Sequence, residues 1–525
     1  MLRHLSYKAY LLLFLFFIFG PIIFILGQSF FSGSLSDQET WAYILDSMLW
    51  DLTRDTILLA FLTVLFSSLL GFSQAYLISF SNIKHKGALH LLFVMPLIFP
   101  LYVLGFVYVG SLEYSGLIPS FIRNNLGINI LSYIDIKSVL GVAFVFSLAL
   151  SPYIYLYLKS CFGAMDRKLF LSARSLGKTP NQIARTIVFP QALPWLLSGG
   201  ILVCLEVFCD FGGVSVFNYE TFSTAIYHAW ISLFSINTAV KLSLFPTVFA
   251  LILYLISQYK FRVKEGKSKL QEDIILLELK GLSKKIVYLL VITYAAFSVF
   301  FPVSQLLIWS LEAIKVELDS DYFLLIGETL IIGSVVAFSI NFISLLFLYF
   351  QRFKFGAREN SILPITKLGY AIPGSIVAVS IMAFFSTVNI SYSGLLSLLA
   401  LFLAYLIKFY SVPSELMARG MSGISKKMDW SSISLGKSTG FTFFKVQLPL
   451  LKPVLLSSFV LVLIEVFKEM PITLILRPFG VNTLATRVYE LTSEGEWERA
   501  SISALFLIAL GAVSLYISEK VINKK

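Results

Sequence analysis

The chain has 525 residues, of which 57% are hydrophobic and 14% are charged, and its mean hydropathy is +0.83. This composition excludes a water-soluble protein of ordinary type and indicates a protein whose solvent is the bilayer. A formal net charge of +11 is compatible with a nucleic-acid partner, but the basic residues lie in alternate loops, which is the pattern that orients membrane proteins. We therefore expect a lipid bilayer around the chain and no nucleic acid.

A membrane-spanning helix needs about 20 apolar residues, and the sequence contains about twelve such segments, half of them in each half of the chain. The first segment has too long an apolar run for a cleaved signal peptide, so we expect it to remain as a membrane helix. The twelve predicted spans are approximately 9–30, 55–80, 88–112, 138–160, 195–216, 238–259, 285–310, 323–350, 364–388, 394–412, 454–476 and 499–520.

The loops between these spans alternate in charge. If the spans alternate in direction, every basic segment lies on one side, and by the positive-inside rule this side is cytoplasmic. Both termini and the central segment 260–284 are then cytoplasmic. The basic segments are 3–8, 84–86, 159–185, 260–285, 352–367, 408–452 and 520–525, and acidic residues gather in 37–51, 312–321 and 490–498.

One block of sequence occurs twice, 259 residues apart. Ser175-Leu176-Gly177-Lys178 recurs as Ser434-Leu435-Gly436-Lys437, and Pro190 and Pro194 recur as Pro449 and Pro453. A repeat of this length in an apolar chain is typical of a transporter made of two fused halves. We expect an all-α polytopic membrane protein with two tandem parallel six-helix repeats: residues 1–259, a polar linker at 260–284 that acts as a tether, and residues 285–525.

The repeated block is a long cytoplasmic loop between the fourth and fifth span of each half, at about 166–190 and 425–449. Its first copy predicts a helix, a turn at Gly177 and a second helix that ends before Pro190. Gly436 and Pro449 hold the same places in the second copy. An apolar and basic helix that is presented to the cytoplasm needs a partner to cover it.

This layout resembles the cytoplasmic "EAA" loop of binding-protein-dependent ABC importer permeases, in which the loop is a coupling helix that docks on an ATP-hydrolysing subunit. The glutamate that names the motif is Leu171 in one copy and Trp430 in the other, which removes any salt bridge to the ATPase at this position but keeps the shape of the loop. The resemblance assigns coupling to Leu171, Ser172, Ala173, Arg174, Leu176, Gly177, Trp430, Ser431, Ser432, Leu435 and Gly436.

The fifth span of each half contains two acids in the same register, Glu206 with Asp210 and Glu465 with Glu469. A spacing of four residues predicts that both carboxylates lie on one helical face. An acid in the hydrocarbon is costly unless it faces a cavity or a partner, so the four are candidates for the substrate path. Oxygen ligands favour hard metal ions, which makes them candidate metal ligands as well. Alternatively, Lys468 forms a structural ion pair with Glu465 or Glu469.

Two longer stretches of sequence indicate a more specific family within these permeases. Residues 210–230 and 465–490 are similar to the corresponding parts of ferric-iron ABC importer permeases, and both contain a threonine-led segment, with Thr221 and Tyr227 in one and Thr483 and Tyr489 in the other. Membership implies two fused six-helix halves around a pseudo-twofold pore in the bacterial inner membrane. It also implies two copies of a separate ABC ATPase and an extracytoplasmic iron-binding protein.

The chain contains no G-x-x-x-x-G-K-[ST] loop, so ATP and Mg are expected on the partner ATPase, with no cofactor on this chain. No nucleophile, base and orienting group occur together, and we predict a pore subunit and not an enzyme. His228, Tyr219, Tyr227 and Tyr489 remain open either as ferric ligands or as packing residues. Two other functions also stay open: a permease for thiamine, polyamine or an oxyanion, and a secondary cation transporter that needs no ATPase.

Overall fold

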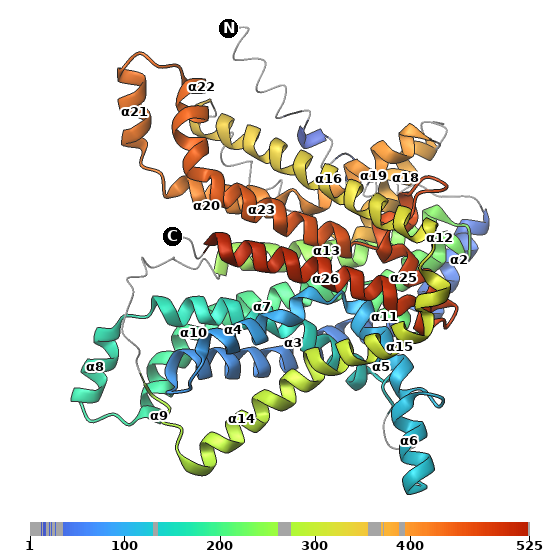
Figure 1. Ribbon diagram of the computed structural model, residues 1–525. Helices are drawn as coiled ribbons and strands as arrows, with labels where there is room; N and C mark the ends of the chain where they lie inside the picture. The colour runs from blue at the N-terminus through green and yellow to red at the C-terminus, as the bar shows by residue number, and fades with distance from the viewer. Residues whose placement is uncertain are drawn as a thin grey trace.

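In the computed structural model the chain is a bundle of helices that run roughly side by side (Figure 1). The structure describes residues 35–129, 135–260, 275–354, 369–370, 372–387 and 394–522, with single positions between 12 and 27. Within these ranges the β-structure is limited to one isolated bridge, between Ser81 and Leu277. The all-α prediction is therefore confirmed.

The first half contains the helices from α2 to α13. They comprise the long membrane helices and several short helices at their ends. Their bounds are α2 Leu35–Ser47, α3 Leu49–Phe80, α4 Lys86–Val94, η1 Met95–Ile98, α5 Leu101–Leu112, α6 Leu117–Leu126, α7 Val139–Ala164, α8 Arg167–Ser175, α9 Pro180–Ile183, η3 Ala184–Val188, α10 Phe189–Cys209, α11 Gly212–Val216, α12 Phe222–Ile231 and α13 Ile236–Lys260.

The second half repeats this order. Its elements from α21 to α24 follow those from α8 to α11 at the offset seen in the sequence, and α25 and α26 follow α12 and α13 at an offset two or three residues longer. The four helices around the coupling loops, α8, α9, α21 and α22, lie at one end of the bundle (Figure 1). The bounds are α14 Gly281–Ala295, η4 Ala296–Phe300, α15 Phe301–Glu317, α16 Ser320–Phe353, α18 Gly374–Thr387, α19 Leu395–Phe409, α20 Ser411–Ser422, α21 Lys426–Ser434, α22 Thr439–Thr442, η6 Phe443–Gln447, α23 Leu448–Lys468, α24 Pro471–Leu476, α25 Leu484–Ser493 and α26 Trp497–Ile522.

Nine helices of the described chain are long and apolar enough to cross a membrane, and a tenth span results if α19 and α20, which meet at 46°, are counted as one. The predicted span 88–112 is broken, because η1 and Pro100 separate α4 from α5. Most of the predicted span 9–30 and part of 364–388 lie outside the described residues. The predicted span 394–412 corresponds to the bent pair of α19 and α20, and each of the other predicted spans corresponds to a helix that is long and apolar enough to cross a membrane.

The predicted end of a helix before Pro190 is wrong. Helix α9 continues through the π-helical turn η3 into α10, so Pro190 lies inside one helical run from Pro180 to Cys209. Proline lacks an N–H donor and its ring conflicts with the carbonyl four residues earlier, whereas a widened turn relieves both problems. The same π-helical turn precedes Pro302 and Pro449.

The two halves interlock instead of merely touching. Ile226 and Val240, on α12 and α13, belong to the same buried cluster as Ile376 and Ala404 on α18 and α19. On another side of the bundle, Phe106 of α5 stacks between two tryptophans of the second half, with ring centroids 6.1 Å and 6.3 Å away. The interface between the halves is therefore part of the hydrophobic core.

The C-terminal end of the predicted linker is hydrogen-bonded to the first half and is therefore more than a tether. The backbone N–H groups of Leu276 and Leu277 donate to the carbonyl of Phe80 at 2.9 Å, and the N–H of Leu279 donates to Asn82 at 2.8 Å. Helix α14 already begins at Gly281, inside the segment predicted as linker. Residues 275–280 thus fasten the start of the second half to the first half.

Candidate functional site

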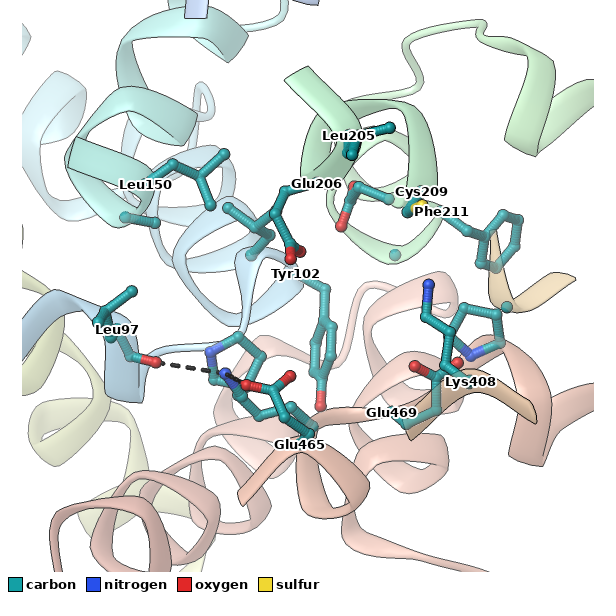
Figure 2. Close-up of a pocket in the computed structure, with 18 of the residues that line it drawn as sticks. Leu97, Tyr102, Leu150, Leu205, Glu206, Cys209, Phe211, Lys408, Glu465 and Glu469 are labelled. Carbon is teal, nitrogen blue, oxygen red and sulfur yellow. Dashed lines mark hydrogen bonds and ion pairs between the residues drawn. The ribbon is translucent and has the colours of Figure 1, made fainter. Parts of the chain in front are cut away.

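A cavity of about 130 Å³ lies between the halves, with room for about four water molecules. All four acids that the sequence singled out line it, Glu206 and Asp210 from the first half and Glu465 and Glu469 from the second. Figure 2 shows Glu206 across the cavity from Glu465 and Glu469. The structure therefore brings together two pairs that are 259 positions apart in the chain. Several tyrosines and two lysines complete the polar lining, namely Tyr102, Tyr153, Tyr370, Lys408 and Lys468.

The two acids of each half do not share a helical face, contrary to the prediction. Helix α10 ends at Cys209 and α23 ends at Lys468, so Asp210 and Glu469 are C-cap residues with extended backbone. Each carboxylate turns to the next short helix and accepts a hydrogen bond from its first turn. Asp210 accepts from the N–H of Val214 at 3.0 Å, and Glu469 accepts from the N–H of Ile472 at 3.2 Å.

These contacts explain why the chain breaks here. The first N–H groups of a helix have no partner within the helix, and a carboxylate beside them also suits the positive end of the helix dipole. Space around both carboxylates is tight. A Cβ added at Gly213 would lie 2.7 Å from Asp210 Oδ2, and a Cβ added at Gly374 would lie 2.5 Å from Glu469 Oε1. Both glycines thus let the backbone approach the carboxylates.

The other acid of each pair remains on its helix and has a different partner. Glu206 Oε1 accepts a hydrogen bond from the hydroxyl of Tyr370 at 2.8 Å, which joins the two halves across the cavity. Glu465 Oε1 lies 3.4 Å from Lys468 Nζ. The sequence alternative in which Lys468 pairs with a neighbouring acid is therefore realised with Glu465.

Lys408 is a site residue that the sequence reasoning missed. It lies near the end of α19 with only 7% of its surface exposed, and its ammonium group donates to the carbonyl of Ile372 at 2.8 Å and more weakly to that of Tyr370 at 3.3 Å. The sequence shows it as the first of many basic residues in segment 408–452, which suggested a loop. Its position within an apolar run was the available signal, because a lysine inside a span usually marks a functional site.

Tyr102 presents a buried hydroxyl to the cavity. The residue is 5% exposed and lines the cavity near the centre of the view in Figure 2. Its Oη has no hydrogen-bond partner among the described residues. A buried polar atom without a partner is uncommon in folded proteins, and it points to a group that the protein itself does not supply.

In the described part of the chain, no three or more His, Cys, Asp or Glu side chains are arranged to hold a metal ion. The four acids proposed as metal ligands therefore line one cavity without converging on one point in this conformation. Figure 2 shows Glu206, Glu465 and Glu469 spread around its wall, with Tyr102 between Glu206 and the other two. The cavity has four carboxylates against two ammonium groups, a formal excess of two negative charges.

An aromatic cluster of Phe211, Tyr227 and Tyr489 lies beside the cavity. Phe211 lines the cavity, and its ring is 4.5 Å from that of Tyr227 on α12 and 5.6 Å from that of Tyr489 on α25. Both helices lie at the end of the bundle opposite the coupling loops (Figure 1). The two repeat-related tyrosines thus meet where the halves meet.

Several other candidates lie away from the cavity lining. Tyr219 donates to the carbonyl of Asp55 at 3.3 Å, and His228 is exposed beside Tyr227. Arg477 and Arg487 pair with local acids, at 2.5 Å from Glu490 and 2.6 Å from Glu317 respectively.

The coupling loops have the predicted helix–turn–helix form. Asp166 caps α8 and Ser425 caps α21 through hydrogen bonds to backbone N–H groups. Gly177 and Gly436 follow with φ of 76° and 74°, the left-handed conformation that glycine adopts without strain. The same chain geometry is thus built twice from different sequences.

Each coupling loop also presents large apolar side chains. Leu176 and Leu435, which precede the glycines, are 80% and 78% exposed, and Leu171 and Trp430, at the position of the missing glutamate, are 50% and 63% exposed. In contrast, Ala173 and Ser432 face inward and are buried. Such exposure on a turn outside the bundle is typical of a docking surface.

Comparisons with known proteins agree with this architecture. The family described as "binding-protein-dependent transport system inner membrane component" matches twice, at residues 64–259 and 330–525. The Fe(3+)-transport system permease protein FbpB 2 of Haemophilus influenzae is 24% identical over 90% of this chain and 90% of its own length. The ferric transport system permease protein FbpB of Actinobacillus pleuropneumoniae is 21% identical over 96% of this chain and 76% of its own length.

Two matches to one family, one in each half, account for the repeated coupling loops, the interlocked helices and the cavity between the halves. Because the matches together cover most of the chain, they place it in the family without reliance on any single relative. The chain belongs to the inner membrane components of binding-protein-dependent transport systems, as a multi-pass ABC importer permease with two fused permease domains.

Proposed function

We propose that this permease moves ferric iron from an extracytoplasmic binding protein into the cytoplasm, driven by ATP hydrolysis on a separate subunit. The observation that carries the proposal is the convergence of four carboxylates, two from each half, on one cavity. Carboxylate and phenol oxygens suit a hard, highly charged cation. The ferric permeases among the relatives support the same substrate class.

The partners follow from the two ends of the molecule. Two exposed coupling helices, α8 and α21, offer one docking site each, so the assembly contains two ATPase copies that hold ATP and Mg. This chain itself needs no bound cofactor. Helix α26 ends at the same end of the bundle as α8 and α21 (Figure 1), which supports a cytoplasmic C-terminus. The charge pattern of the loops puts the N-terminus on the same side.

The test is uptake of radiolabelled iron by proteoliposomes that contain the chain, its ATPase and its binding protein. Replacing Glu206 by Gln together with Asp210 by Asn removes two charges from the cavity and keeps most of the shape. We expect ATP-dependent uptake to be lost while stimulation of the ATPase is retained. The matched control replaces Asp51 by Asn and Glu113 by Gln, two acids outside the cavity lining.

Three outcomes separate the alternatives. Uptake by the double variant at the rate of the wild type would remove these acids from the ion path. Uptake without the ATPase would support the secondary cation transporter. Absence of iron uptake by the complete wild-type assembly, together with uptake of thiamine, a polyamine or an oxyanion, would support one of the other permease functions.

A further inference from the structure

The two walls of the cavity carry unequal charge. At the offset of the repeat, the positions that correspond to Lys408 and Lys468 are Ala149 and Cys209, and both of these residues also line the cavity. The first half therefore contributes two acids and neither lysine, whereas the second half contributes two acids and both lysines. A pore for a metal cation thus contains two built-in cations on one wall.

Both lysines contact backbone carbonyls, and neither forms a close ion pair with a described residue. Lys468 Nζ lies 3.4 Å from Glu465 Oε1 and 3.4 Å from the carbonyl of Leu97 (Figure 2). Lys408 donates to two backbone carbonyls and has no ion pair within 4.0 Å among the described residues. Lysine ammonium groups are compact charges on flexible stems. Lys468 can therefore change partners without a change in the backbone.

The carboxylates, for their part, are occupied by groups of the protein. Each of the four acids accepts from a tyrosine, a lysine or a backbone N–H group, as described above, and no metal-binding cluster is formed within the described chain. At the same time the buried hydroxyl of Tyr102 has no hydrogen-bond partner in the part of the chain that the structure describes. The cavity thus combines satisfied carboxylates with a polar group that still lacks a ligand.

We propose that Lys408 and Lys468 are resident counter-cations, which offset part of the negative charge of the empty cavity, and that Lys468 exchanges with the metal cation during transport. When the ion enters, it takes the carboxylates, and the ammonium group of Lys468 leaves Glu465 for the carbonyl oxygen of Leu97 that it already contacts. Lys408 stays on the carbonyl oxygens of Tyr370 and Ile372 as a fixed counter-charge. When the ion leaves, Lys468 returns to Glu465. This inference rests on the proposed function, because it assumes that the transported species is a cation.

The physical reason for the exchange is that the ion must be released after it has bound. Four carboxylates without counter-charge in a partly buried site attract a trivalent ion strongly, because Coulomb energies grow as the local dielectric falls. A site that binds too tightly cannot pass its ion on. The two ammonium groups lower the affinity of the site for the ion, and they offset part of the desolvation penalty of the unoccupied acids.

The experiment measures binding of terbium(III), a redox-inert trivalent probe, to the purified full chain by its luminescence. Lys408→Met and Lys468→Met remove one charge each at similar length. We expect each variant to bind terbium at least about tenfold more tightly than the wild type, since one counter-charge is lost from a partly buried site. Lys408→Arg and Lys468→Arg, which keep the charge, are the matched controls and should bind like the wild type.

Lys408→Gln covers the case in which the methionine variant does not fold, because the amide keeps a hydrogen-bond donor on this side chain but has no charge. Terbium affinity that is unchanged or weaker in the neutral variants would overturn the exchange. Iron uptake by the complete wild-type assembly is measured in parallel. If that uptake occurs and the neutral variants bind terbium no better, the exchange alone fails; if wild-type uptake is absent, the proposed function fails.

Discussion

The two coupling helices are anchored by different chemistry at equivalent positions. In the first half, Phe170 of α8 is 1% exposed and packs against Phe80 with ring centroids 5.8 Å apart. At the offset of the repeat, Phe170 corresponds to Asp429 of α21, which pairs with Arg352 at 2.7 Å. Gln447 donates a further hydrogen bond to the same carboxylate at 2.5 Å. We therefore predict that removal of Asp429 releases α21 and leaves α8 in place.

The size of this effect follows from the burial of the ion pair between Arg352 and Asp429. The side chains of Arg352 and Asp429 are only 9% and 7% exposed. Removing one partner of a buried ion pair leaves an uncompensated charge and costs about 3–5 kcal/mol. For Asp429→Leu this cost acts on the local opening of α21, where about 3 kcal/mol corresponds to roughly a hundredfold faster exchange of its amide hydrogens. Replacing both partners, Asp429→Leu with Arg352→Met, restores most of the stability because no charge is left buried.

The assay is hydrogen–deuterium exchange of residues 426–434 in the full chain, with α8 as the internal reference. Glu415→Leu is the control, since its pair with Arg419 is exposed and contributes less than about 1 kcal/mol. Either of two results would refute the reasoning. One is hydrogen–deuterium exchange of α21 in Asp429→Leu at the wild-type rate. The other is exchange of α21 in the double variant as fast as in Asp429→Leu alone.

Three further predictions concern other parts of the molecule. Leu435→Asp puts a charge on the exposed tip of its coupling loop, and we expect stimulation of the partner ATPase to fall at least about tenfold. Unchanged stimulation of ATP hydrolysis would show that this tip is not part of the docking surface. Gly374→Ala forces the Glu469 carboxylate to move, so iron uptake should fall in an assembly that still forms; normal uptake would contradict it. Glu317→Gln weakens three hydrogen bonds from two arginines, which should lower the free energy of unfolding by about 2 kcal/mol. The midpoint of thermal unfolding should fall, and an unchanged midpoint would show that solvent screens these contacts.

The sequence was most informative where the same local turn and cap residues occur in both halves. Gly177 and Gly436 adopt the same left-handed turn, and the prediction of two helix–turn–helix loops is confirmed because the local chemistry of caps and glycine turns determines them. The four acids were found as candidates by the cost of charge in a membrane. Their roles in transport stay a prediction, although the structure places them at one cavity.

What the sequence could not predict depends on contacts between distant segments. Periodicity put Asp210 on a helical face with Glu206, but the unpaired N–H groups of α11 draw its carboxylate to the next helix and end α10 at Cys209. Likewise Pro190 looked like a helix end, whereas a π-helical turn accommodates it. Lys408 stood at the edge of a basic segment and only tertiary packing places its ammonium group in the cavity.

The central claim is that the substrate passes through the cavity between the halves, and Cys209, which lines this cavity, offers a direct test. In a chain with Cys161 and Cys204 replaced by serine, a small thiol reagent is applied during ATP-driven iron uptake, and a chain that keeps only Cys204, outside the cavity lining, is the control. The account predicts that modification of Cys209 blocks uptake and that iron loaded on the binding protein slows the modification. Uptake that continues at the wild-type rate with Cys209 fully modified would contradict it.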